Sequence, residues 1–166
     1  NVKIGPFHYL FVSPRIILRE QLTVGVSSNS DKTFFQNGLY FNDYNLMRYD
    51  LKATILTPVH IRLLLNPYLF TTNFTDLPAA TGDGVFDKSN PKLSERGFGI
   101  AAGAKLYHFR WGQPELSVEY MRNVDKTFGW NDYDQLTFRF AWENQYFMKW
   151  FGYLLQTSFS QINSEN

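Results

Sequence analysis

Three histidines, His8, His60 and His108, are the side chains best suited to acid–base chemistry at neutral pH, because an unperturbed imidazole titrates near that pH. None of them has a partner in the sequence at the spacing of a catalytic pair or a metal site. His60 belongs to the short segment TPVH, and His108 precedes Trp111 near the end of a run of alternating residues. The sequence therefore predicts surface or interfacial histidines, with no catalytic residue, no metal site and no cofactor.

Pairs of carboxylates are the second candidates for chemistry. Glu115 and Glu119 would lie on one face of a strand, where two carboxylates can share a proton. Many basic residues share that face, so ion pairing is the expected role. Asp83 and Asp87, in TGDGVFDKSNPK, do not have the spacing of a helix–loop–helix calcium site. The chain has no cysteine, which excludes a thiolate zinc site and a cysteine nucleophile.

The overall composition narrows the possible classes of protein. A chain of 166 residues, of which 44% are hydrophobic, suits a single domain over residues 1–166. The 16 basic and 15 acidic residues form no long run of one sign, so we expect no nucleic-acid partner. No stretch is long and apolar enough to predict a transmembrane helix. The aromatic content of 18% favours strands and membrane interfaces.

Charged residues recur at every second position in several segments. In NLMRYDLKATIL, residues 45–56, apolar side chains alternate with Arg48, Asp50 and Lys52. A period of two is typical of a β-strand. The same alternation predicts eight strands, at residues 2–12, 15–27, 38–56, 60–71, 97–111, 115–122, 134–145 and 149–160.

The connections between these strands are of two kinds. Short ones fall at residues 13–15, 57–60, 111–115 and 144–149, and long polar ones at residues 27–37, 71–97 and 122–134. Because short and long connections alternate, we predict an all-β fold, an up-and-down antiparallel β-barrel of about eight strands. Both termini would then lie at the end with the long loops.

One face of the predicted strands is apolar, and the other carries charges of both signs. Buried charges are tolerated when they are paired, so near-balanced charges suit the lumen of a narrow barrel. The predicted lumen charge network consists of Arg48, Asp50, Lys52, Arg62, Lys105, Glu115, Glu119, Arg139 and Glu143. Aromatic residues gather near the ends of the strands, as membrane interfaces favour. The predicted interface aromatics are Phe109, Trp111, Tyr146 and Trp150 near the short turns, with Phe128 and Trp130 near the long loops.

The segments LMRYDLKATIL, GFGIAAGAKLYHFRW and QLTFRFAWENQYF together resemble the small bacterial outer-membrane β-barrels. The resemblance is architectural and matches no specific family motif. It implies a transmembrane barrel of the bacterial outer membrane, not an enzyme, with a structural, adhesive or narrow-pore role. It also implies membrane lipids as partners, and other envelope proteins bound through residues 71–97 and 122–134. Glu20 and His108 fall on the apolar face, which predicts a bulge, a misread register or an interfacial position. Pro67 falls inside a strand, which predicts a bulge or an edge strand.

Two other functions fit the same alternation. In a soluble lipocalin-like carrier, or another secreted or periplasmic protein, the apolar face would point inward. An apolar ligand would then contact residues such as Tyr49, Leu65, Phe138, Phe140 and Trp142. An outer-membrane lipid-modifying enzyme would need an activity that depends on histidine. Asp50→Ala and Arg139→Ala should be damaging if the charged face is a lumen and nearly silent if it faces solvent.

Overall fold

The computed structural model describes residues 2–27, 34–35, 39–40, 44–79, 89–107, 112–128, 132–148 and 151–164. Every regular element in these ranges is a β-strand. No helix capable of crossing a membrane occurs within them. The strands are β1 (Val2–Ile4), β2 (Phe7–Ser13), β3 (Ile16–Ser27), β4 (Phe34–Phe35), β5 (Leu39–Tyr40), β6 (Tyr44–Leu56), β7 (Ile61–Pro78), β8 (Lys92–Leu106), β9 (Gln113–Asp125), β10 (Tyr133–Met148) and β11 (Phe151–Ser164).

Nine of these strands form one antiparallel sheet in the order β1-β3-β6-β7-β8-β9-β10-β11, with β2 also paired to β3. Strands β1 and β2 lie end to end along the same edge of β3, since Val2 pairs with Val26 and Phe7 with Gln21. The Leu22 amide donates to the Pro6 carbonyl between them, at 3.2 Å. β1 and β2 thus act as one interrupted strand, and the sheet has eight strand positions in sequence order. The predicted all-β, up-and-down order is confirmed. Strands β4 and β5 pair separately.

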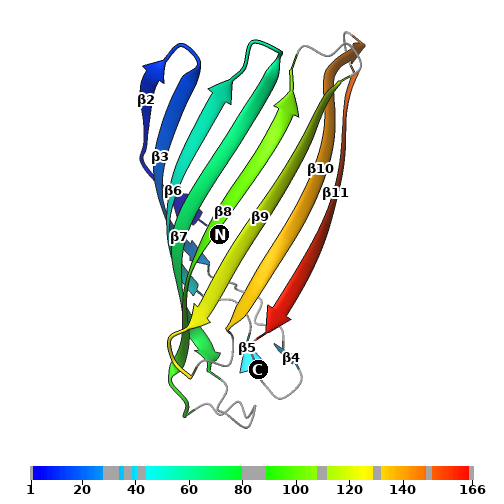
Figure 1. Cartoon of the computed structure of the whole chain (residues 1–166). Coiled ribbons are helices and arrows are strands. Elements are labelled where there is room, and N and C mark those ends of the chain that lie inside the picture. Colours follow the sequence, from blue (N-terminus) through cyan, green and yellow to red (C-terminus); the bar gives the residue numbers. More distant parts are fainter. Residues whose placement is uncertain are drawn as a thin grey trace.

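The sheet curls into a trough but does not close (Figure 1). Its edges are β1 with β2 on one side and β11 on the other, and no Cα atom of β1 or β2 lies within 8 Å of one in β11. The expectation of a closed barrel is therefore not met in the structure. A physical reason lies in the first edge, which is broken at Gly5 and Pro6, where proline offers no N–H to a further strand.

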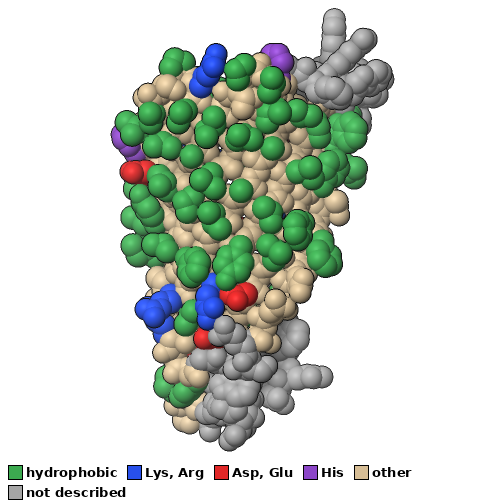
Figure 2. Space-filling view, in the orientation of Figure 1, with side chains coloured by type: hydrophobic (Ala, Val, Ile, Leu, Met, Phe, Trp, Pro, Cys, Tyr) green, Lys and Arg blue, Asp and Glu red, His purple; other side chains and the backbone are tan. Residues whose placement is uncertain are grey.

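The apolar face of the sheet is its convex, outer face. Leu69, Leu116 and Phe138 are 61%, 64% and 51% exposed, although a soluble core would bury such side chains. Figure 2 views the convex side and shows hydrophobic side chains over its middle, with charged side chains mainly toward the ends. The alternating charged residues consequently line the concave side. This arrangement answers the question raised by residues 45–56: the charged face is the inner one.

Pro67 does not produce the bulge or edge position expected from the sequence. Strand β7 is central, and its register with β6 is the same before and after the proline, with Asp50 opposite Tyr68 and Ala53 opposite Leu65. The ladder to β6 is interrupted only opposite Leu51 and Lys52. Because proline has no N–H to donate, the ladder has a local gap at this point, and the pairing continues in the same register on both sides of it.

Glu20 lies on the outer face without any shift in the register of β3 against β6, so the expected bulge is absent there as well. It is opposite His8 on β2 and Leu51 on β6. His108 is outside the described residues. The termini follow the prediction, because Val2 and Ser164 pair near the ends of strands that lead into the long loops.

The predicted loop at residues 71–97 is partly strand. Strand β7 continues to Pro78 and β8 begins at Lys92, so both strands extend beyond the apolar alternation. Polar contacts hold this extension: the Thr71 hydroxyl donates to the Glu95 carbonyl at 3.0 Å, and the Ser94 hydroxyl donates to Asn73 Oδ1 at 2.7 Å. Sequence alternation missed the extension because these side chains are polar on both faces.

Candidate functional site on the concave face

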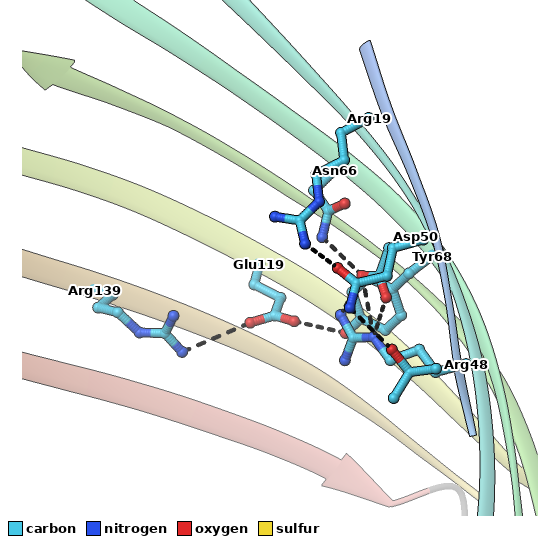
Figure 3. A network of polar contacts seen from close by, with 9 residues as sticks. Arg19, Arg48, Asp50, Asn66, Tyr68, Glu119 and Arg139 are labelled. Atoms are coloured by element: carbon cyan, nitrogen blue, oxygen red, sulfur yellow. Dashed lines mark hydrogen bonds and ion pairs between the residues drawn. The ribbon is translucent and has the colours of Figure 1, made fainter. Parts of the chain in front are cut away.

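The concave face is built by every second residue of the central strands. Because side chains in a strand alternate between faces, Arg48 and Asp50 of β6 point to the same side. Residues directly opposite each other in a ladder share a face of the sheet. Tyr68 of β7 therefore lies on that side, because it is opposite Asp50. Glu119 of β9 and the residue opposite it, Thr137 of β10, lie on the same side. Figure 3 shows these side chains converging inside the trough.

Arg48 and Asp50 form the tightest ion pair of the described residues. Arg48 Nη2 donates to Asp50 Oδ1 at 2.8 Å, and Arg48 Nε donates to Oδ2 at 2.9 Å. Asn66 Nδ2 from β7 donates to the same carboxylate at 3.1 Å. The side chains of Arg48 and Asp50 are only 34% and 19% exposed, so the pair is partly withdrawn from water. Two-point geometry of this kind makes a charged hydrogen bond strong and directional.

Tyr68 connects this ion pair to residues on the other side of the trough. The Arg48 guanidinium lies 3.8 Å from the centre of the Tyr68 ring, and the Tyr68 hydroxyl donates to Glu119 Oε1 at 2.6 Å. Glu119 Oε2 in turn lies 3.8 Å from Arg139 Nη2 on β10. The network thus runs from β6 to β10 (Figure 3).

The network passes over β8 because that strand has only the small residues Gly99 and Ala101 at the crossing, opposite Tyr68 and Glu119. Tyr68 is 3% exposed and packs on Gly99, where an added Cβ atom would overlap the tyrosine ring. Tyr68 was not among the predicted network residues. The signal was present in GFGIAAG, whose small residues at alternate positions make room for a large side chain on a neighbouring strand.

A second cluster joins three of the predicted network residues. Lys105 Nζ of β8 lies 2.9 Å from Glu143 Oε2 of β10 and 3.9 Å from Glu115 Oε2 of β9. Lys105 is 16% exposed, so it is the most buried basic group among these ion pairs. Glu115 and Glu119 therefore contact different cations, as their expected pairing role requires.

Two of the predicted network residues are not joined to it. Lys52 is exposed and has no ion pair within the described part of the chain. Arg62 lies 5.9 Å from the centre of the Tyr107 ring, and its Nε has no hydrogen-bond partner among the described residues. The sequence predicted which face these residues occupy but not which of them pair.

The predicted aromatic belts fall mainly outside the described residues. Phe109, Trp111, Trp130 and Trp150 are not described, and neither is the side chain of Tyr146. Phe128, near a long loop, is described and is 44% exposed. On the outer face at that end, the Tyr120 hydroxyl donates to Asp134 Oδ1 at 2.9 Å.

The described histidines have no surroundings typical of catalysis. His8 is exposed on the outer face, and His60 is exposed in a tight turn with a positive φ of 59°, beside the Tyr107 ring. Within the described ranges, no three His, Asp or Glu side chains are grouped so that they could hold a metal ion. Comparison with known proteins gave no matching family model, curated protein or solved structure.

Proposed function

We propose that the chain is an integral membrane β-barrel protein of the bacterial outer-membrane class, with a structural, adhesive or narrow-pore role and no enzymatic activity. The observation that carries this proposal is the inverted polarity of the sheet. Apolar side chains cover the convex face, while ion pairs and a buried tyrosine occupy the concave one. A lipid environment stabilises that arrangement, because lipid can solvate the apolar face and the charges are paired with one another.

The length of the strands supports the same proposal. A β-strand that crosses the hydrocarbon layer needs about 9 to 11 residues. Among the six strands from β6 to β11, the two shortest are β6 and β9, and each has 13 residues. In the membrane, we infer that the free edges complete a barrel by pairing β11 with β1 and β2. These edges run antiparallel to each other, since an odd number of antiparallel steps separates them.

A narrow interior follows from this proposal. An eight-stranded barrel is just wide enough for its own side chains to fill, so wide diffusion is not expected. Contacts with envelope proteins would use the connections proposed from residues 71–97 and 122–134. In the described part of the second connection, Asp125 accepts from the Thr127 amide and Asp132 accepts from the Asp125 amide, each at 2.7 Å.

Cell fractionation tests this proposal. The full chain, expressed with a secretory signal in a bacterium, should stay with the outer membrane through an alkaline carbonate wash and leave it only in detergent. A soluble periplasmic protein in the same preparation provides the control. Recovery of a folded, monomeric chain in plain buffer would contradict a membrane location.

A soluble carrier of an apolar ligand is less consistent with the geometry. Its expected ligand contacts, Tyr49, Leu65 and Phe138, are on the exposed convex face rather than inside the trough. Saturable quenching of tryptophan fluorescence by a fatty acid in plain buffer would favour the carrier. A lipid-modifying enzyme would require an activity that is lost when His8, His60 and His108 are all replaced.

A further inference from the structure

The trough contains a hollow of about 630 Å³ whose charged lining is mostly basic. Its charged residues are Lys3, Arg19, Arg48 and Lys52 against the single carboxylate of Asp50. These residues come from three neighbouring strands: Lys3 from β1, Arg19 from β3, and the other three from β6. Strand β1 pairs with β3, and β3 pairs with β6. The hollow therefore has one basic wall near the free edge of the sheet.

Asp50, the one carboxylate among the described residues of this wall, already accepts several hydrogen bonds. Asp50 accepts three hydrogen bonds from Arg48 and one from Asn66. Lys3, Arg19 and Lys52 have no ion pair within the described part of the chain. Among the described residues, this wall consequently carries more positive than negative charge.

Two of these three basic residues, Arg19 and Lys52, are direct neighbours in the sheet. Arg19 on β3 is opposite Lys52 on β6 in the ladder, and like charges directly opposite each other destabilise a sheet. Arg62 opposite Lys105 is a second pair of basic residues on this face, and it differs because Glu143 and Glu115 lie near Lys105. Among the described residues, the Arg19 guanidinium donates to Gln21 Oε1 at 2.7 Å and lies 5.1 Å from the centre of the Phe7 ring, while its buried Nε has no hydrogen-bond partner.

We propose that this hollow binds a small anion that carries phosphate or carboxylate groups, held by Arg19 and Lys52 with Lys3 at its margin. The free N–H groups of Arg19 and the Lys52 ammonium are the donors that such oxygens prefer. The Phe70 side chain lines the same hollow and offers an apolar surface to the body of the ligand. The volume lies within the range of small-molecule sites.

Calorimetric titration of the detergent-solubilised full chain with pyrophosphate at low ionic strength tests this site. We expect saturable binding of one pyrophosphate per chain. The double variant Arg19→Gln/Lys52→Gln should weaken it roughly tenfold or more, since both charged donors are lost. The matched control is Arg15→Gln/Lys126→Gln, which removes the same net charge at two exposed residues that do not line the hollow. Lys52→Gln alone serves as a milder variant, because Lys52 is exposed.

Short-chain phosphatidic acid, used below its micelle concentration, distinguishes a lipid headgroup from a free anion. If only this lipid binds, and the double variant loses it, the anionic group belongs to a lipid and the site stands. If neither probe saturates the chain, or if the control variant loses as much affinity as Arg19→Gln/Lys52→Gln, the proposal is wrong. The titration tests anion binding and the fractionation tests membrane location, so either claim can be wrong while the other holds.

Discussion

At the scale of single residues, Asp50 is the side chain on which the inner network most depends. It accepts from both Arg48 and Asn66, whereas Arg139 makes one contact of 3.8 Å and is 47% exposed. We expect Asp50→Ala to lower the free energy of unfolding by roughly 1.5 to 3 kcal/mol, the range for a hydrogen bond to a charged group. Equilibrium unfolding of the detergent-solubilised chain in urea measures this change.

Arg139→Ala is the matched comparison for that substitution. Because its ion pair is half exposed, we expect a loss of only about 0 to 1 kcal/mol. The structure therefore separates two substitutions that the sequence had predicted to be equally damaging. Equal unfolding midpoints for wild type and Asp50→Ala would show that the inner network contributes little.

Gly99 provides a second test at this scale. A Cβ atom there would overlap the Tyr68 ring, so Gly99→Val should displace the ring and weaken its bond to Glu119. Overpacking of this kind destabilises by about 1 to 3 kcal/mol. Ala104→Val, on the exposed outer face of the same strand, should be close to neutral. Similar unfolding free energies for the two variants would contradict the packing of Tyr68 on β8.

At the scale of elements, the period of two was sufficient to predict the strands and their order, because each central strand has one apolar and one charged face. The prediction was weaker where that contrast disappears. The polar ends of β7 and β8 were assigned to a loop, and Pro67 was expected to mark a bulge or an edge strand although β7 is central and keeps its register. Hydrogen bonds from the backbone, which alternation does not encode, decide both cases.

The two free edges lead to a prediction about β2 and β11. If they pair in the membrane, an outward-facing cysteine at Leu10 should form a disulfide within the chain with a cysteine at Leu155, Thr157 or Phe159. The chain has no natural cysteine, so the variants need no background correction. Faster migration without reductant in denaturing electrophoresis detects the bond. Disulfides formed only between chains would indicate that the edges pair with another molecule.

At the scale of the whole molecule, the sequence could predict two faces of opposite character but not which one is inside. Alternation is the same for a soluble barrel and for an inverted one, since both give a period of two. The curvature of the sheet decides the matter, and it places Tyr68 on Gly99 and the ion pairs of Asp50 and Lys105 on the concave side. The sequence also predicted a closed barrel where the structure has an open sheet, because closure depends on two edges that are far apart in the chain.

The central claim is that the convex face contacts lipid. Single cysteines at Leu65, Leu116 and Phe138 on that face, and at Gln21 and Ser117 on the concave face, can each carry a fluorescent label in the cysteine-free chain. After reconstitution in vesicles that contain brominated lipid, the three convex labels should be strongly quenched by bromine, and the two concave labels only weakly. Convex labels that brominated lipid does not quench, but that aqueous iodide does, would contradict the account.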